Sequence, residues 1–308
     1  MRGTSVALYN YADYNEKILG NTSIIMAKPD DNLNKSKDKF TSRFEVNFSY
    51  FNGYDTQKYI IDNNIDYLYV IKEGTQADGI VLKETPTLVH SVFRHNDPHG
   101  HKYAYISNWL AEDQGYDPYT HSVPHMVEKL PQSTYNLRDK LGIPKNKTVF
   151  GYYGGSEEFN IAFAKETVIR VAKEREDIVF LFMNIQKFGE EVPNVIFLKG
   201  TWVLEEKAAF VRACDALLHA RAYGETFGLV CGEFSLENKP VITYGGSEER
   251  AHIQIIGERG ILYNTQEQLY DVLHNLDTYI KYDDYYTPYL DYSPEIIMET
   301  FKRVFIGQ

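Results

Sequence analysis

The chain has 308 residues, which is enough for two domains that each bury their own core. Hydrophobic residues make up 43% and charged residues 24%, the usual balance of a globular protein. The formal net charge of −11 argues against a general binder of nucleic acid or of anionic membranes, because that affinity comes mainly from Lys and Arg.

The first 120 residues alternate between helix-like and strand-like segments. Residues 4–18 predict an amphipathic helix, and "SIIMA" at 23–27 predicts a short buried strand. Strands are then expected at 44–51, 66–74 and 85–93 and at the start of 102–112, with helices at 56–65 and at the end of 102–112. Such alternation predicts a parallel, doubly wound sheet. The series opens with a helix, so the usual first strand with its glycine loop is absent from it.

A second series follows a proline-rich segment at 118–148, which predicts a linker. Strands and helices alternate again, which predicts a second domain of the same kind. The expected strands are 148–155, 177–184, 194–200, 215–220 and 239–244, and the expected helices are 158–176, 205–214, 227–238 and 266–276. The fold class is therefore α/β, with two Rossmann-like doubly wound domains, the first without its usual opening strand.

The stretch "YGETFGLVCGEFSLENKPVI" carries the strongest chemical pattern. Gly224 and Gly228 permit a tight turn before a helix, and the amides of residues 227–229 would point out of the helix start, where phosphate binds. Glu225 precedes that helix and Glu233 lies within it, about 10 Å away at ~1.5 Å per residue. The pair could accept hydrogen bonds from hydroxyls at both ends of a diphosphate, with Arg221 supplying charge. Alternatively, Glu225 caps the helix and Glu233 is solvated.

These residues resemble the E-x-x-x-x-x-x-x-E signature of the retaining GT-B glycosyltransferases (glycosyl transferases group 1, family 4-like). The resemblance covers residues 146–280 clearly and 1–120 more faintly. It implies an acceptor-side domain at 1–125, a linker at 126–147 and a nucleotide-sugar domain at 148–290. It also implies a C-terminal helix within 291–308 that crosses back to the first domain, and residues 293–305 have suitable apolar spacing and a Ser-Pro start.

The resemblance assigns roles residue by residue. Glu233 matches the glutamate that binds the nucleotide ribose, and Glu225 matches the one beside the donor sugar's hydroxyls. The amides of Phe227, Gly228 and Leu229 match those that meet sugar and phosphate. "GYYGG" matches the first loop of the donor domain, but the family's usual arginine and lysine are missing there, so Arg221 is our choice for the phosphate charge. The remaining candidates in the donor loops are Tyr153, Gly154, Gly155, Met183, Asn184 and Lys199. For the last three, the alternative is that they are strand-end residues without a ligand.

Histidines gather in the first half of the chain. His90 is our choice for the family's active-site histidine that faces the acceptor, with His95 in reserve. The alternative is a metal site formed by His90, His95, His99 and His101, but their spacing is irregular and the resemblance implies no catalytic metal. We therefore expect neither a metal nor another cofactor.

The resemblance thus implies an enzyme that moves a sugar from a nucleoside-diphosphate sugar to a saccharide or glycan acceptor, with retention of configuration. A GT-B sugar-nucleotide epimerase and a non-catalytic sugar-nucleotide binding protein are the alternatives. An oxidoreductase is disfavoured because no G-x-G-x-x-G fingerprint occurs. The two cysteines lack metal or redox spacing and no apolar run reaches ~20 residues, which favours a cytoplasmic protein without a transmembrane segment. The sequence does not indicate an oligomeric state.

Overall fold

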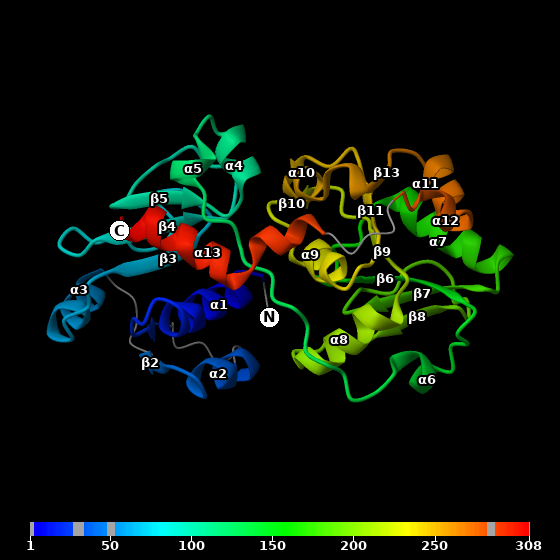
Figure 1. Cartoon of the computed structure of the whole chain (residues 1–308), viewed down its shortest axis with the longest axis horizontal. Helices are drawn as coiled ribbons and strands as arrows, with labels where there is room; N and C mark the ends of the chain where they lie inside the picture. The colour runs from blue at the N-terminus through cyan, green and yellow to red at the C-terminus, as the bar shows by residue number, and fades with distance from the viewer. Residues whose placement is uncertain (1–2, 27–33, 48–52, 282–286, 308) are drawn as a thin grey trace. The chain divides into compact units, whose positions relative to one another are not determined.

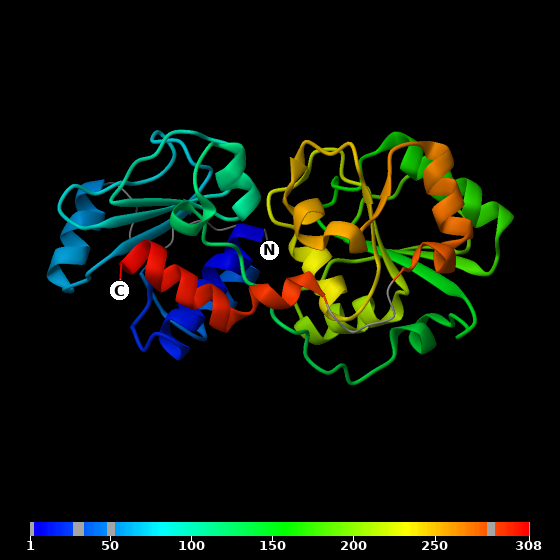
Figure 2. The ribbon, with the colours of Figure 1, turned by 45° about the horizontal axis from the view of Figure 1, so that its top comes forward.

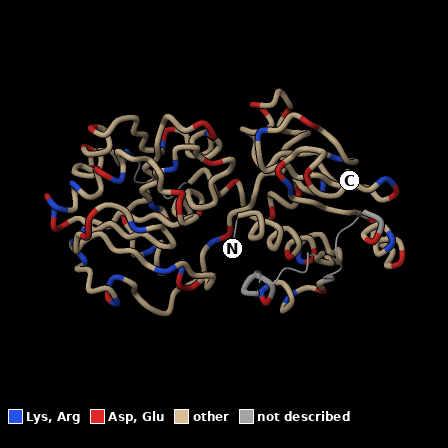
Figure 3. Tube along the Cα trace, turned by 180° about the vertical axis from the view of Figure 1, so that it is seen from behind, with Lys and Arg blue, Asp and Glu red and all other residues tan. Residues whose placement is uncertain are grey.

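The computed structural model describes residues 3–26, 34–47, 53–281 and 287–307. These residues form two compact units, of which unit 1 contains residues 1–126 and 292–308 and unit 2 contains residues 127–291 (Figure 1). The C-terminal segment therefore belongs to the same unit as the N-terminal half of the chain. Figure 3 shows acidic and basic residues interspersed along both units.

Unit 2 is built on a six-stranded parallel sheet in the order β13-β11-β9-β6-β7-β8. The strand order reverses between β6 and β9, so right-handed crossovers place helices on both faces of the sheet. Figure 2 shows α7 and α11 on one face, with α8 and α9 on the other. The strands are β6 Thr148–Tyr153, β7 Ile178–Met183, β8 Val195–Leu198, β9 Ala216–His219, β11 Val241–Tyr244 and β13 Ile261–Tyr263, with a separate parallel pair β10 Gly224–Glu225 and β12 Glu249–Arg250.

The helices of unit 2 lie between these strands along the chain. They are α6 Leu137–Leu141, α7 Ala162–Glu174, α8 Leu204–Ala213, α9 Leu229–Leu236, α10 Ala251–Ile256, α11 Gln266–His274 and α12 Leu276–Tyr279. Two of them begin later than expected. The amides of Asn160 and Ile161 donate to the Ala220 carbonyl, so α7 starts only at Ala162. Gly228 is in the left-handed conformation, so α9 starts at Leu229.

Unit 1 holds a three-stranded parallel sheet, β3-β4-β5, and a separate parallel pair, β1-β2. The strands are β1 Ile24–Met26, β2 Glu45–Asn47, β3 Leu68–Lys72, β4 Thr87–Ser91 and β5 Lys102–Tyr105. The helices are α1 Gly3–Lys17, α2 Asn34–Thr41, α3 Gly53–Asp62, α4 Asn108–Asp113, α5 Pro118–His121 and α13 Pro294–Phe301, followed by a π-helical turn at Lys302–Ile306. The sequence did not predict α2, and residues 48–51 of the expected strand lie outside the described residues.

The C-terminal helix supplies much of the core of unit 1. α13 begins with Pro294 in its first turn and buries Ile297, Met298 and Phe301 against α1 and β4. Val304 and Phe305 of the π-helical turn join the same cluster. The apolar spacing in the tail therefore serves packing within unit 1.

A cavity of about 1150 Å³ lies inside unit 1 between β1 and β3. It is lined by all three residues of β1, by Leu68–Ile71 of β3 and by one side of α1. Within the described ranges, no strand pairs with β1 or β3 across this space. The sheet is therefore divided at this point.

The proline-rich segment that we expected to be a linker groups with unit 2 from Val127 onward. Arg212 on α8 donates to the carbonyls of Leu130 and Pro131, which ties this segment to α8. Both cysteines are buried and unpaired. Among the described helices, none combines the length and the apolar character needed to cross a membrane.

Candidate functional site

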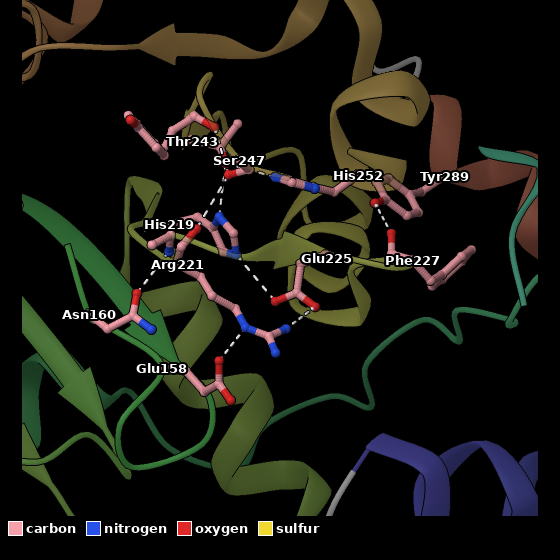
Figure 4. Close-up of polar contacts among 12 residues, drawn as sticks. Glu158, Asn160, His219, Arg221, Glu225, Phe227, Thr243, Ser247, His252 and Tyr289 are labelled. Atoms are coloured by element: carbon pink, nitrogen blue, oxygen red, sulfur yellow. Dashed lines mark hydrogen bonds and ion pairs between the residues drawn. The ribbon is translucent and has the colours of Figure 1, made fainter. Parts of the chain in front are cut away.

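The candidate site lies in unit 2, where the carboxyl-terminal ends of β6, β9 and β11 approach the start of α9. Glu225 reaches it from β10, which pairs in parallel with β12 (Figure 4). Gly224 has a φ of +82°, and a Cβ atom at this position would collide with the Glu249 carbonyl oxygen. Glycine is therefore required for β10 to approach β12 and to present Glu225.

Glu225 is held by a contact to each of its oxygens. Arg221 Nη1 donates to Oε2 at 2.9 Å, and His219 Nε2 lies 3.3 Å from Oε1. Burial opposes ionisation of the Glu225 carboxyl, but the hydrogen bond from His219 and the charge of Arg221 outweigh it and lower the pKa to about 2. Glu225 is therefore a carboxylate at neutral pH, with its orientation fixed from both sides.

Arg221 forms ion pairs with two carboxylates, so its charge is not reserved for a phosphate. Its Nε contacts Glu158 Oε2 while its Nη1 binds Glu225, and a quarter of the side chain is exposed. Burial lowers the pKa of Arg221, but the two carboxylates more than offset this and raise it overall. The guanidinium is therefore a fixed cation whose charge is largely balanced, a constraint that the sequence did not reveal.

The start of α9 has the geometry expected from the glycine turn. Gly228 precedes the helix with a φ of +92°, and a Cβ atom there would lie 2.7 Å from the Cβ of His252. Phe227 is 2% exposed, and its carbonyl accepts a hydrogen bond from the Tyr289 hydroxyl at 3.2 Å. Leu229 is the first helical residue. The three expected residues thus stand together at the helix start, next to Glu225.

Glu233 lies one turn into α9 and belongs to a cluster with Lys207 and Tyr153, called here the Glu233 cluster. Lys207 Nζ donates to Glu233 Oε1 at 2.5 Å and lies 5.6 Å from the centre of the Tyr153 ring. Glu233 Oε2 and the Tyr153 hydroxyl are buried and have no hydrogen-bond partner among the described residues. Burial, followed by repulsion from Glu128, raises the pKa of Glu233 to about 8.

The Glu233 cluster rules out the alternative that Glu233 is solvated, and it adds Lys207 to the residues of the site. Glu233 is only 12% exposed, so it is not a solvated surface acid. Two buried polar atoms without partners cost free energy, about 1–3 kcal/mol each, unless a bound group satisfies them. Lys207 was missed because it lies 26 positions before Glu233, on another helix, where no sequence motif connects the two.

The remaining donor-loop candidates lie at the ends of β6, β7 and β8. Asn184 has a φ of +60°, and its side-chain amide donates to the Gly154 carbonyl at 2.7 Å, which joins the loops after β6 and β7. Gly155 follows in the first loop and is exposed. Met183 is buried as the last residue of β7, whereas Lys199 is exposed just after β8. Asn184 therefore has a structural contact of its own.

The placement of His90 corrects our choice of an active-site histidine. His90 is completely buried in unit 1, where its Nε2 donates to the Val123 carbonyl and its Nδ1 accepts from the Tyr69 hydroxyl, both at 2.7 Å. Burial lowers the pKa of His90 to about 4, although the bond to Val123 opposes this shift. Both nitrogens are occupied in a closed core, so His90 has no atom left for an acceptor.

The other three histidines of the group at residues 90–101 do not gather around a common point. His99 accepts a hydrogen bond from Lys72 and donates to the Asp97 carbonyl, while His95 is partly exposed and His101 is exposed. Within the described ranges, no three His, Cys, Asp or Glu side chains are arranged to hold a metal ion.

Three buried residues behind Glu225 were not predicted from the sequence. His219 ends β9, Thr243 lies in β11 and His252 lies in α10, and all three are fully buried. His219 Nδ1 lies 2.8 Å from Thr243 Oγ1, which lies 2.9 Å from His252 Nε2. The one available signal was a histidine at the end of an otherwise apolar strand, "DALLHA".

No protein-family model matches this sequence, and no curated protein matches it. Solved structures do resemble the fold. A glycosyltransferase from Rickettsia africae ESF-5 aligns with a TM-score of 0.68 at 12% identity, over 99% of this chain and 96% of that one. The Anabaena protein HepE in complex with UDP-glucose gives 0.61 at 13% identity, over 100% and 94%. A protein from Listeria monocytogenes described as a UDP-N-acetylglucosamine 2-epimerase gives 0.60 at 15% identity, over 100% and 95%.

At such low identities the likeness concerns the fold, and it extends over nearly the whole chain. Two units with parallel sheets are what the sequence predicted. The chain therefore has the GT-B fold of two Rossmann-like domains.

Proposed function

We propose that unit 2 binds a nucleoside-diphosphate sugar and that the protein transfers the sugar to a hydroxyl of a saccharide or glycan. The observation that carries this proposal is the pair Glu225 and Glu233 on either side of the α9 start. Glu225 is an oriented carboxylate, and Glu233 holds a buried oxygen without a partner among the described residues. The helix start between them offers backbone amides to an anion.

Each residue has a defined role in this proposal. Glu233 Oε2 accepts a hydrogen bond from a ribose hydroxyl, and the amides of residues 227–229 bind the diphosphate. Glu225 accepts from hydroxyls of the donor sugar. Lys207 and Arg221 supply positive charge, with Lys207 added because Arg221 is shared between two carboxylates. Met183, Asn184 and Lys199 remain candidates near the base.

The proposed reaction retains the configuration of the sugar. The bond between the anomeric carbon and the donor phosphate breaks, and the acceptor oxygen bonds to the same carbon on the same face. The acceptor proton passes to the departing phosphate oxygen, so no protein base is needed. The protein contributes fixed charges and dipoles around the phosphate that gains negative charge. No metal ion takes part.

A GT-B sugar-nucleotide epimerase is the second candidate, because the fold neighbours include proteins described as 2-epimerases. An epimerase would change the sugar nucleotide without an acceptor. A non-catalytic binding protein would leave the sugar nucleotide intact under all conditions. Product analysis separates the three functions.

The test combines binding with turnover. Thermal unfolding should be measured with UDP, GDP, ADP and their sugars, beginning with UDP-sugars because HepE was solved with UDP-glucose. A ligand at 100 times its dissociation constant stabilises the folded protein by about 2.7 kcal/mol. Each stabilising sugar nucleotide is then incubated with and without oligosaccharide acceptors, and the products are analysed. If no nucleotide or sugar nucleotide stabilises the protein, the proposal is wrong.

A further inference from the structure

The buried residues behind Glu225 form a continuous chain of polar contacts. It runs from His252 Nε2 to Thr243 Oγ1 at 2.9 Å, from Thr243 Oγ1 to His219 Nδ1 at 2.8 Å, and from His219 Nε2 to Glu225 Oε1 at 3.3 Å (Figure 4). The two imidazole rings lie 4.9 Å apart, centre to centre. Four separate elements, α10, β11, β9 and β10, contribute one residue each.

The Glu225 carboxylate, at one end of this chain of contacts, determines which atoms in the chain carry the protons. A carboxylate only accepts hydrogen bonds, so His219 Nε2 must carry the proton that faces Oε1. When His219 is neutral, this proton is the only one on its ring. A neutral His219 protonated at Nε2 has a lone pair at Nδ1, which accepts from the Thr243 hydroxyl.

The Thr243 hydroxyl is the next link in this chain of contacts. Thr243 has a single hydroxyl proton, and donating it to His219 leaves its oxygen as an acceptor. His252 Nε2, at 2.9 Å, must then donate to that oxygen. Burial, with a smaller contribution from His219, lowers the pKa of His252 to about 3, which agrees with a neutral ring. Every donor in the chain points toward Glu225.

We propose that His252, Thr243 and His219 act as positioning residues that lock the Glu225 carboxylate in one orientation for the donor sugar. His219 holds Oε1 and Arg221 holds Oε2, so the carboxylate cannot rotate when a ligand enters. A fixed acceptor loses less free energy on binding and on reaction than one that must be ordered first. This role rests on the proposed function, but the order of the protons can be measured without it.

The first experiment measures the tautomers directly. Nitrogen-15 NMR of the full chain at pH 7, with His219 and His252 assigned by substitution, should show both rings neutral and protonated at Nε2. A ring protonated at Nδ1 alone, or a doubly protonated His219, would overturn the proton order. This readout requires no substrate, so it stands even if the protein transfers no sugar.

The second experiment removes the central hydroxyl. Thr243→Val keeps the branched shape in a strand but removes both hydrogen bonds, while Thr243→Ser keeps the hydroxyl. Turnover of the donor should fall about tenfold in Thr243→Val, as expected for the loss of about 1.4 kcal/mol in the transition state, and recover in Thr243→Ser. Affinity for the free nucleoside diphosphate should stay unchanged, because it does not contain the sugar that Glu225 meets.

The matched control is Thr167→Val in α7, which removes another fully buried threonine hydroxyl, one that donates to the Phe163 carbonyl. It should leave turnover unchanged. Equal losses in Thr167→Val and Thr243→Val, or no rescue by Thr243→Ser, would show that the chain only supports stability. If wild-type protein binds no sugar nucleotide, the proposed function fails instead, and the tautomers still decide the proton order.

Discussion

At the residue scale, the two glutamates of one motif occupy opposite electrostatic environments. Glu225 has a pKa of about 2 because the bonds from His219 and Arg221 outweigh its burial, whereas burial raises the pKa of Glu233 to about 8. Glu225 is therefore ready to accept hydrogen bonds in the free protein. Glu233 gains a partner for its second oxygen only when something binds, so the two should respond differently to substitution.

Glu233→Ala should weaken binding of the donor and of the free nucleoside diphosphate equally. Both ligands contain the ribose that Glu233 is proposed to meet, and leaving a buried ribose hydroxyl without its partner costs about 1–3 kcal/mol. Calorimetric titrations with both ligands provide the measurement. Glu205→Ala, at an exposed position of α8, is the control and should leave both affinities unchanged. Normal nucleotide affinity in Glu233→Ala would exclude the ribose role.

Glu225→Ala should lower turnover while affinity for the free nucleoside diphosphate remains near normal. The proposed contact is to the transferred sugar, so the loss should be roughly tenfold to a hundredfold in kcat/KM, equivalent to about 1.5–3 kcal/mol. Steady-state kinetics and nucleotide titration should be run on the same preparation. Should nucleotide affinity drop as much as in Glu233→Ala, the division of roles between the two glutamates is incorrect.

At the element scale, the C-terminal helix α13 is part of the core of unit 1. Phe301→Ala should lower the free energy of unfolding of this unit by about 3–5 kcal/mol, because the ring is 5% exposed and packs against Tyr11, Tyr69 and Phe305. Ile296→Ala in the same helix removes a side chain that is 45% exposed and should change stability by at most about 0.5 kcal/mol.

Denaturant unfolding followed by near-ultraviolet circular dichroism measures both variants. The proposed nucleotide binding by unit 2 serves as the internal reference and should remain normal wherever unit 2 is still folded. Similar destabilisation by Phe301→Ala and Ile296→Ala would contradict the packing of α13 described here.

Because the sheet of unit 1 is divided beside β3, the amides along this strand should differ in their hydrogen-exchange rates. Leu68 donates to the Pro86 carbonyl beside β4, so alternate residues of β3 face β4, and Tyr69 and Ile71 direct their amides toward the cavity. Hydrogen exchange should therefore be faster at Tyr69 and Ile71 than at Val70 and Lys72. β7, which pairs on both sides, is the control and should show uniform protection. Equal protection along β3 would mean that its outer edge is covered.

At the scale of the whole molecule, the protein should work without a divalent ion. Turnover should survive exhaustive treatment with EDTA, because Lys207, Arg221 and the α9 amides supply the positive potential that a cation would give to a diphosphate. The assay compares treated enzyme with and without added Mg²⁺ or Mn²⁺. A rate that is lost on treatment and restored by the ion would show that these groups are not sufficient.

Much of the fold could be predicted from local signals. Apolar strands such as "DIVFLFMN" are buried on both faces of a parallel sheet, so they appear as continuous hydrophobic runs, and β7 lies where that run predicts it. Local signals do not determine where each helix begins, since the start of α7 depends on hydrogen bonds from residues 160 and 161 to Ala220, some 60 positions away. Arg212 helps to group residues 127–147 with unit 2, and it lies 81 positions from Pro131, whose carbonyl it binds.

The α/β class, the two-domain order and the Glu225–Glu233 motif could all be predicted from the sequence, because hydrophobic period, turn residues and short spacings are properties of neighbouring residues. Which polar groups meet depends on the three-dimensional fold. It buried His90 in a core, paired Arg221 with Glu158, and brought Lys207 to Glu233 and His219, Thr243 and His252 to Glu225. Burial and pairing set the charge and orientation of a side chain, and both depend on residues far away along the chain.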